Sequence, residues 1–171
     1  MVTRRSGILL GVSLAAAAAM AADGSAIGPG FHLKDARGGL VDLSQYKGKV
    51  VLLNFWETTC GGCKIEIPWF IEFEKRYKRR GLAVIGVALD EDGWIPVKPF
   101  VTKKKMNYRV VIGNDGLARS YGVESLPATF LIGRDGRIVS ADVGRLVDRA
   151  KCEIAIRALL AAGSAYLAGS K

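Results

Sequence analysis

Apolar residues gather in two runs that have the length of β-strands. Residues 50–56 and 82–89 are apolar at nearly every position. Such runs are typical of strands that are covered on both faces of a sheet. Residues 128–132 and 138–143 flank the turn Arg134-Asp135-Gly136-Arg137 and are predicted to form a hairpin. A shorter strand is expected over residues 108–112.

The segments between the strands have helical spacing. Over residues 63–80, apolar side chains recur at intervals of three and four with charged residues between them, and Gly81 follows the last turn. Early alternation of strands and helices favours parallel strands joined by right-handed crossovers, and the hairpin adds an antiparallel edge. We therefore predict an α/β fold with a central mixed β-sheet and helices on both faces. Further helices are expected over residues 94–106, 114–121 and 146–167.

The N-terminal segment has the composition of an export signal. Arg4 and Arg5 precede an unbroken run of apolar and small residues over 8–20. Residues 1–21 are therefore predicted to be a signal peptide that is cleaved near Ala21. An uncleaved membrane anchor is the alternative, because the run is at the short end of spanning length. Residues 22–30 are predicted to form a linker, and residues 31–168 the folded domain.

Composition and charge exclude some classes of protein. Half of the 171 residues are hydrophobic, and three cysteines are too few for a disulfide scaffold. The formal net charge is +9, with basic clusters at residues 75–80 and 103–105. Both clusters fall at predicted helix ends, where cations complement the helix dipole. No nucleic-acid partner is therefore predicted.

The candidate chemistry is the motif Cys60-Gly61-Gly62-Cys63, which follows a buried strand and opens a helix. Two cysteines at this spacing can form a disulfide with little backbone movement. The free N–H groups and the positive dipole end of the helix stabilise a thiolate on the first cysteine. We assign nucleophilic attack on a partner disulfide to Cys60 and resolution of the mixed disulfide to Cys63.

Other interpretations of the cysteines are weaker. A structural zinc site needs four ligands, and the chain has a single histidine, His32. Haem attachment needs histidine after the second cysteine, where Lys64 stands. A purely structural disulfide would close so small a loop that it constrains the unfolded chain weakly. Cys152 shares a helical face with apolar residues and is predicted to be a buried, inert thiol, with an intermolecular or regulatory thiol as the alternative.

Residues 54–68, NFWETTCGGCKIEIP, resemble the active-site segment of the TlpA/ResA/CcmG group of bacterial thioredoxin-like proteins. Residues 31–35, 43–49, 81–87 and 121–132 are similar to the same group in the same order. The resemblance implies a thioredoxin-like fold with the N-terminal extension and insertion typical of this group.

The resemblance also implies roles for four residues. Pro127 matches a proline that is cis and packs against the cysteine pair, which leaves the backbone of Leu126 free to hold an extended peptide; an ordinary proline at a strand start is the alternative. Glu66 matches an acidic residue that relays protons, and burial would suit that role by raising its pKa; a solvated carboxylate is the alternative. Trp56 matches an aromatic residue beside the active site, with plain core packing as the alternative.

Three residues depart from the pattern of the group, and a fourth departs from the pattern of cytoplasmic thioredoxins. Gly62 stands where proline is usual, which should loosen the loop and shift the balance between dithiol and disulfide. Thr59 replaces a tryptophan and removes apolar contact surface for a partner. Glu57 introduces a carboxylate three residues before the first cysteine. Asn54 takes the place of the buried aspartate of cytoplasmic thioredoxins, so that acid–base catalysis would fall to Glu66 or to water.

The resemblance implies a thiol–disulfide oxidoreductase of the periplasm or the outer face of the cytoplasmic membrane. It would act as a reductant of protein disulfides, for example in cytochrome c maturation or copper-site assembly. A membrane electron donor of the CcdA/DsbD type would recharge it. We expect a monomer that needs no cofactor beyond the Cys60–Cys63 disulfide and no metal. The alternatives are a disulfide oxidase or isomerase, a peroxiredoxin-like thiol peroxidase, and a non-catalytic binding module.

Overall fold

The computed structural model describes residues 26–168. The expected signal or anchor over residues 1–21 lies outside the described residues, as do residues 22–25 of the expected linker. Within residues 26–168, none of the helices combines the length and apolarity that crossing a bilayer requires. In chain order the elements are β1 (His32–Lys34), β2 (Leu40–Asp42), the 3-10 helix η2 (Leu43–Tyr46), β3 (Val50–Trp56), α2 (Gly61–Tyr77), the 3-10 helix η3 (Lys78–Arg80), β4 (Leu82–Ala88), α3 (Trp94–Lys104), β5 (Arg109–Ile112), α4 (Asp115–Ser120), β6 (Ala128–Ile132), β7 (Ile138–Val143) and α5 (Arg149–Ala168).

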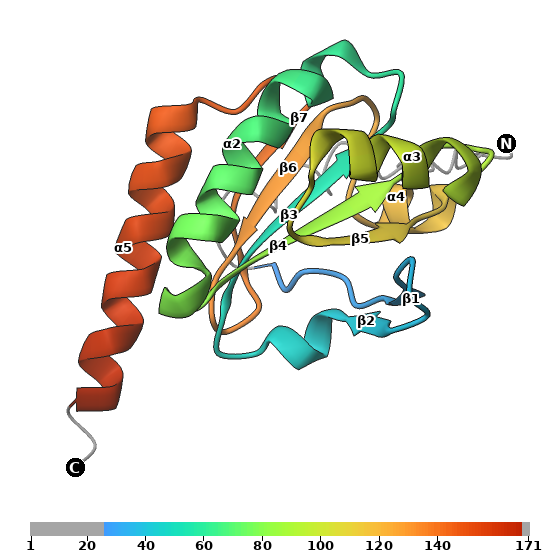
Figure 1. Ribbon diagram of the computed structural model, residues 1–171. Helices are drawn as coiled ribbons and strands as arrows, with labels where there is room; N and C mark the ends of the chain where they lie inside the picture. Colours follow the sequence, from blue (N-terminus) through green and yellow to red (C-terminus); the bar gives the residue numbers. More distant parts are fainter. Residues whose placement is uncertain (1–25, 169–171) are drawn as a thin grey trace, which may run out of the picture.

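Five strands form the central sheet in the order β5-β4-β3-β6-β7 (Figure 1). β3 pairs with β4 and β4 with β5 in parallel, whereas β6 is antiparallel to both β3 and β7. The predicted mixed sheet with a C-terminal hairpin is therefore confirmed. β3 lies at the centre of the sheet, so its carboxyl end, where the chain turns into α2, has a neighbouring strand on each side.

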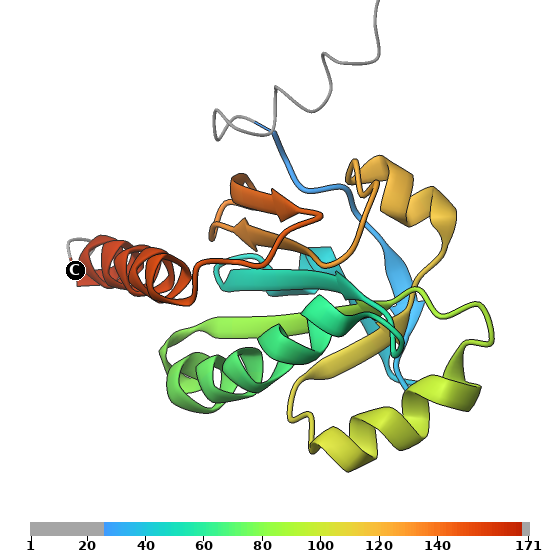
Figure 2. The same ribbon diagram turned by 90° about the horizontal axis from the view of Figure 1, so that it is seen from above.

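Helices cover both faces of the sheet, as predicted (Figure 2). Helices α2, α3 and α5 pack on the face to which β3 contributes Leu52 and Trp56. Helix α4 and the N-terminal hairpin β1–β2 cover the other face, against Leu53 and Phe55. Every residue of β3 and of β4 is buried. Burial on both faces explains why neither strand alternates between apolar and polar residues.

Most element boundaries agree with the prediction within a few residues. Helix α2 begins two residues earlier than the apolar spacing indicates, and η3 completes the basic segment up to Gly81, whose φ of 102° ends it. The strands β1 and β2 were not predicted. Each has three residues, which is too short for a hydrophobic period to be recognised.

Candidate active site

The two cysteines of the motif lie where the central strand gives way to α2. Cys60 is the N-cap residue of α2, and Cys63 lies in its first turn. Their sulfur atoms are 2.02 Å apart and form the disulfide that the sequence predicts. Cys63 is fully buried, whereas Cys60 is half-buried. Cys60 is therefore the sulfur that a partner can reach.

The backbone around Cys60 favours a thiolate once the disulfide is reduced. The N–H group of Cys63 donates to the Sγ atom of Cys60 at 3.1 Å, and the positive end of the helix dipole lies at the same place. The loop before Cys60 is held by Asp90. Each of its carboxylate oxygens accepts the N–H of Thr58 at 3.1 Å, and Oδ1 also accepts the Thr58 hydroxyl. This loop therefore presents Cys60 from a fixed position at the end of the sheet.

Pro127 and Leu146 lie against the cysteine loop. The Leu126–Pro127 peptide bond is cis, as the resemblance implies. A Cβ atom added at Gly62 would lie 3.0 Å from Cδ of Pro127 and 3.3 Å from Cδ2 of Leu146. Glycine at position 62 thus leaves the space into which these two side chains pack. Leu146, in the loop between β7 and α5, is 42% exposed, and no sequence pattern pointed to it.

This crowding predicts the effect of enlarging Gly62. The substitution Gly62→Ala is expected to lower the free energy of unfolding of the oxidised protein by about 1 kcal/mol, because the new methyl group must displace Pro127 or Leu146. Unfolding in urea measures the change. Gly61→Ala is the matched control, since nothing lies within 4 Å of a Cβ atom there. Equal losses in the two variants would show that crowding is not the cause.

Glu66 is fully buried one helical turn beyond Cys63. Its Oε1 atom accepts the N–H of Val147 at 2.7 Å, and the hydroxyl of Thr129 donates to Oε2 at 3.5 Å. Burial raises the pKa of Glu66 from 4.5 to about 7, although both hydrogen bonds favour the carboxylate. At neutral pH this carboxyl group can therefore both accept and donate a proton. Its burial excludes the alternative of a solvated carboxylate.

A short polar chain leads from Asn54 to Glu66. Asn54 on β3 lies opposite Thr129 on β6, and its Nδ2 atom donates to Oγ1 of Thr129 at 3.0 Å. Because Thr129 donates to Glu66 in turn, all three side chains are connected. Within the described part of the chain, Oδ1 of Asn54 is buried without a hydrogen-bond partner. A neutral amide, rather than a second carboxyl group, is thus linked to the acidic Glu66 through Thr129.

The remaining predicted residues have different positions. Trp56 is fully buried in the core cluster that contains Cys63, with its ring centroid 5.3 Å from that of Phe100. It can therefore support the site by packing but cannot touch a partner. Leu126 is half-buried and packs against both core clusters. Cys152 is free and half-buried, and burial raises the pKa of its thiol to about 12, which keeps it neutral.

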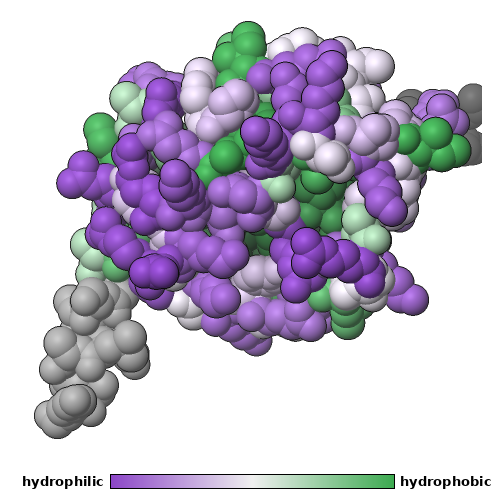
Figure 3. Space-filling view, viewed as in Figure 1, coloured by the Kyte–Doolittle hydropathy of each residue, from purple (hydrophilic) through white to green (hydrophobic). Residues whose placement is uncertain are grey.

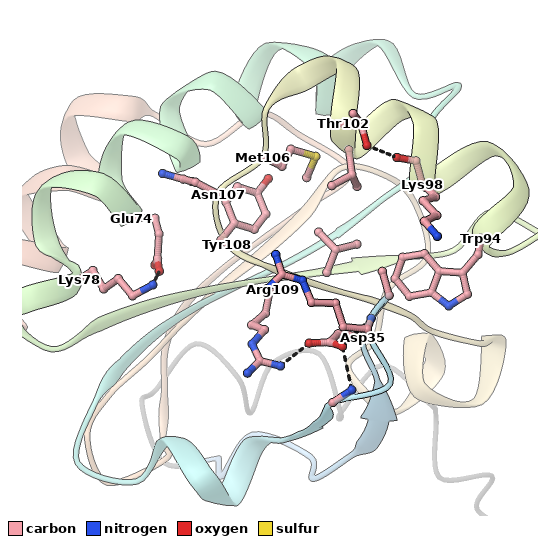
Figure 4. A pocket seen from close by; sticks show the side chains of 15 residues that line it. Asp35, Glu74, Lys78, Trp94, Lys98, Thr102, Met106, Asn107, Tyr108 and Arg109 are labelled. Atoms are coloured by element: carbon pink, nitrogen blue, oxygen red, sulfur yellow. Dashed lines mark hydrogen bonds and ion pairs between the residues drawn. The ribbon is translucent and has the colours of Figure 1, made fainter.

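A cavity of about 690 Å³ lies away from the cysteines, between α2, α3, β5 and the turn that joins β1 to β2 (Figure 4). Trp94 forms part of its wall, and the ion pair of Arg109 with Asp35 lies inside it. No cysteine lines this cavity, so it is separate from the candidate site. Over residues 26–168, no three side chains of the metal-ligating types gather, and His32 pairs with Asp42 at 2.7 Å.

The fold and the site together define a class of protein. A mixed sheet whose central strand leads into a helix capped by a Cys-x-x-Cys disulfide, with a cis proline against the pair, is the arrangement of thioredoxin-like redox proteins. The chain belongs to the AhpC/TSA family, which matches it over residues 26–141.

Similar proteins agree with this assignment. The chain is 38% identical over 112 residues to the thiol-disulfide oxidoreductase ResA of Bacillus thuringiensis subsp. konkukian, a match that covers 65% of this chain and, at 64%, just under two thirds of that protein. It is 36% identical over 121 residues to ResA of Bacillus subtilis, covering 70% of this chain and 67% of that one.

A solved structure agrees as well. The crystal structure of a putative thiol:disulfide interchange protein DsbE from Chlorobium tepidum is 34% identical to the chain, with a TM-score of 0.73, and the match covers 78% of this chain and 95% of that one. The resemblance to the TlpA/ResA/CcmG group and the thioredoxin-like fold are therefore confirmed. The names of these proteins also agree with the predicted oxidoreductase.

Proposed function

We propose that this chain is an extracytoplasmic thiol–disulfide oxidoreductase that reduces disulfides of partner proteins through Cys60 and Cys63. The observation that carries the proposal is the disulfide itself. It joins a reachable Cys60 at a helix N-terminus to a fully buried Cys63, beside Pro127 and above a carboxyl group with a pKa near neutrality. The match to relatives named thiol-disulfide oxidoreductase supports the same activity.

We assign each group a step. In the reduced protein, the thiolate of Cys60 attacks one sulfur of a partner disulfide, whose S–S bond breaks and whose leaving thiolate takes up a proton. Glu66 then accepts the proton of the Cys63 thiol. The sulfur of Cys63 attacks Sγ of Cys60, and the mixed disulfide breaks. The partner's second sulfur leaves as a thiolate and takes up the proton that Glu66 accepted, so the partner is released as a dithiol. Two electrons have passed to the partner, and the Cys60–Cys63 disulfide has formed.

The proposed location and direction rest on the N-terminal segment and on the group that the chain resembles. Residues 1–21 have the composition of an export signal or anchor. Outside the cytoplasm a reductant needs a source of electrons, and a membrane donor of the CcdA/DsbD type would restore the dithiol. Exported proteins that must keep a thiol pair reduced, such as cytochromes before haem attachment or copper carriers, are the proposed substrates.

Trapping of substrates in cells tests this proposal. The variant Cys63→Ser can attack through Cys60 but cannot release the mixed disulfide, so partners should stay attached and can be identified by mass spectrometry. The double variant Cys60→Ser/Cys63→Ser should capture none of them. We expect exported proteins that contain thiol pairs. Recovery of cytosolic proteins alone would contradict the proposed location.

The reduction potential tests the direction. A reductant is expected to lie near thioredoxin, at about −270 mV, whereas a value near about −120 mV would identify an oxidant. Equilibration of the protein with glutathione or dithiothreitol buffers measures it. Rapid turnover of hydrogen peroxide with an external thiol, together with slow exchange with protein disulfides, would favour the thiol peroxidase instead.

A further inference from the structure

The end of the domain that lies opposite the cysteines is built from three loops and from the start of the described chain. The N–H of Gly48 donates to the carbonyl of Arg134 at 2.9 Å, and the N–H of Val50 donates to Gly81 at 2.9 Å. The N–H of Gly28 donates to the carbonyl of Gly136, also at 2.9 Å. Residues 47–49, 78–81 and 133–137 therefore meet at the point where residues 26–28 join the domain.

This end carries a concentration of positive charge, which we call the basic end. Its lysines come from two different segments, at the start of β3 and at the end of α2, and they are exposed. The three loops contribute one exposed carboxylate, that of Asp135, which already lies 3.6 Å from Arg137, and the nearly buried Glu74 of α2 lies 3.4 Å from Lys78. Figure 3 shows that the surface in view is largely hydrophilic over this lower part of the molecule. The basic end comprises Lys47, Lys49, Lys75, Lys78, Arg79, Arg80, Arg134 and Arg137.

The chain outside the structure leads to the same place. The N–H of Ile138, at the start of β7, donates to the carbonyl of Ala26 at 2.9 Å, so the N-terminal segment joins the domain beside the basic end. The apolar run over residues 8–20 is separated from Ala26 by residues 21–25. Those residues span at most about 18 Å when fully extended. If residues 8–20 are retained as the uncleaved anchor, the alternative to a cleaved signal peptide, and insert into a bilayer, the basic end is the part of the domain held against the lipid headgroups.

We propose that the basic end binds an anionic phospholipid surface and that the domain thereby stands with Cys60 facing away from the membrane. Lysine and arginine side chains on one face are attracted to anionic headgroups within about a Debye length. Helix α2 runs from the cysteines to the basic end over 17 residues, and a helix of that length is about 25 Å long. The redox site would therefore be held at roughly that height above the headgroups. The inference concerns orientation and does not depend on the redox chemistry.

Lysine footprinting on vesicles tests the proposal directly. The full chain is reconstituted into vesicles of phosphatidylcholine, or of the same lipid with a third of it replaced by phosphatidylglycerol, and is then acylated briefly with a water-soluble reagent. Lys47, Lys49 and Lys75 are expected to react about fivefold more slowly on the anionic vesicles, and high salt should remove the difference. Residues 103–105 at the end of α3 serve as the internal control and should react equally on both kinds of vesicle.

Variants separate this surface from general cationic attraction. One variant replaces five residues of the basic end by glutamine: Lys47, Lys49, Lys75, Arg79 and Arg80. In this variant Lys78 is the lysine left to report on the basic end, and it should be acylated equally fast on both kinds of vesicle. Disulfide reduction in solution should be unchanged. Changing all three lysines at 103–105 to glutamine should preserve the protection. Equal reactivity of the basic end on both vesicles, or protection of residues 103–105 instead, would overturn the proposal. So would binding of the chain to a DNA duplex that outcompetes the anionic vesicles.

Discussion

Replacing Cys60 by serine is expected to reduce the turnover of disulfide substrates by at least about 10³-fold, because no other sulfur in the site can begin the reaction. Cys63 is fully buried beneath the helix start, so it cannot approach a partner disulfide in line. Serine at position 60 could still accept the N–H of Cys63 but is a far weaker nucleophile at neutral pH. Steady-state reduction of a disulfide peptide, with dithiothreitol as the electron source, measures the loss.

Cys152→Ser provides the matched control for this prediction. Its thiol lies on α5, is half-buried, and has a pKa raised to about 12, so almost none of it is ionised. The turnover rate of Cys152→Ser should therefore remain within about twofold of the parent rate, because the substitution lies away from the reacting sulfurs. Substantial activity in Cys60→Ser would show that Cys63 becomes reachable, and the roles assigned to the two cysteines would then be wrong.

Local sequence patterns correctly predicted the strand and the helix that position the two cysteines. The run over residues 50–56 is buried on both faces because β3 is the central strand, and central strands leave no solvent-facing positions. The motif after that run then had to open a helix on one face of the sheet. The redox pair and its place at a helix N-terminus follow from these two local facts. The cis bond before Pro127 came from the family resemblance and has no local cause that the pattern could reveal.

The partners of Glu66 could not be predicted, because they depend on pairings between distant segments. Thr129 reaches Glu66 only because β6 pairs antiparallel with β3, in the register that sets it opposite Asn54. Val147 lies in the loop before α5, whose path is fixed by packing rather than by any periodic pattern. Burial of Glu66 is likewise a property of the assembled layers. Helical spacing indicated only that this carboxyl group could face the sheet.

The raised pKa of Glu66 lowers the free energy of unfolding at neutral pH, and this predicts a large dependence of stability on pH. In the unfolded chain the group ionises near pH 4.5, whereas in the folded protein it holds its proton up to about pH 7. The contribution of this group to the free energy of unfolding is therefore fully present below pH 4.5 and is lost as the pH rises towards 7. At 1.36 kcal/mol per pKa unit, the loss amounts to roughly 3 kcal/mol.

Glu66→Gln should remove this pH dependence while keeping the shape of the side chain. Glutamine can still accept the N–H of Val147 and can donate to Thr129, but it does not titrate. The difference in the free energy of unfolding, variant minus parent, is expected to increase by roughly 3 kcal/mol as the pH is raised from 4 to 8. Urea unfolding of the oxidised proteins across that range measures the gain. Glu91→Gln, at an exposed position, should show no comparable trend.

Glu66→Gln should also slow the resolution of the mixed disulfide. Without a carboxylate to accept the proton of Cys63, resolution of the mixed disulfide is expected to fall by about 10²-fold near pH 7, the lower range for loss of a positioned base. Single-turnover release of a partner from Cys60 measures this step separately from the initial attack. A buried acid with a pKa near neutrality destabilises the fold above pH 7, and proton transfer to and from Cys63 is the benefit that would explain it. A variant that is more stable at pH 8 and resolves the mixed disulfide at the parent rate would contradict that explanation.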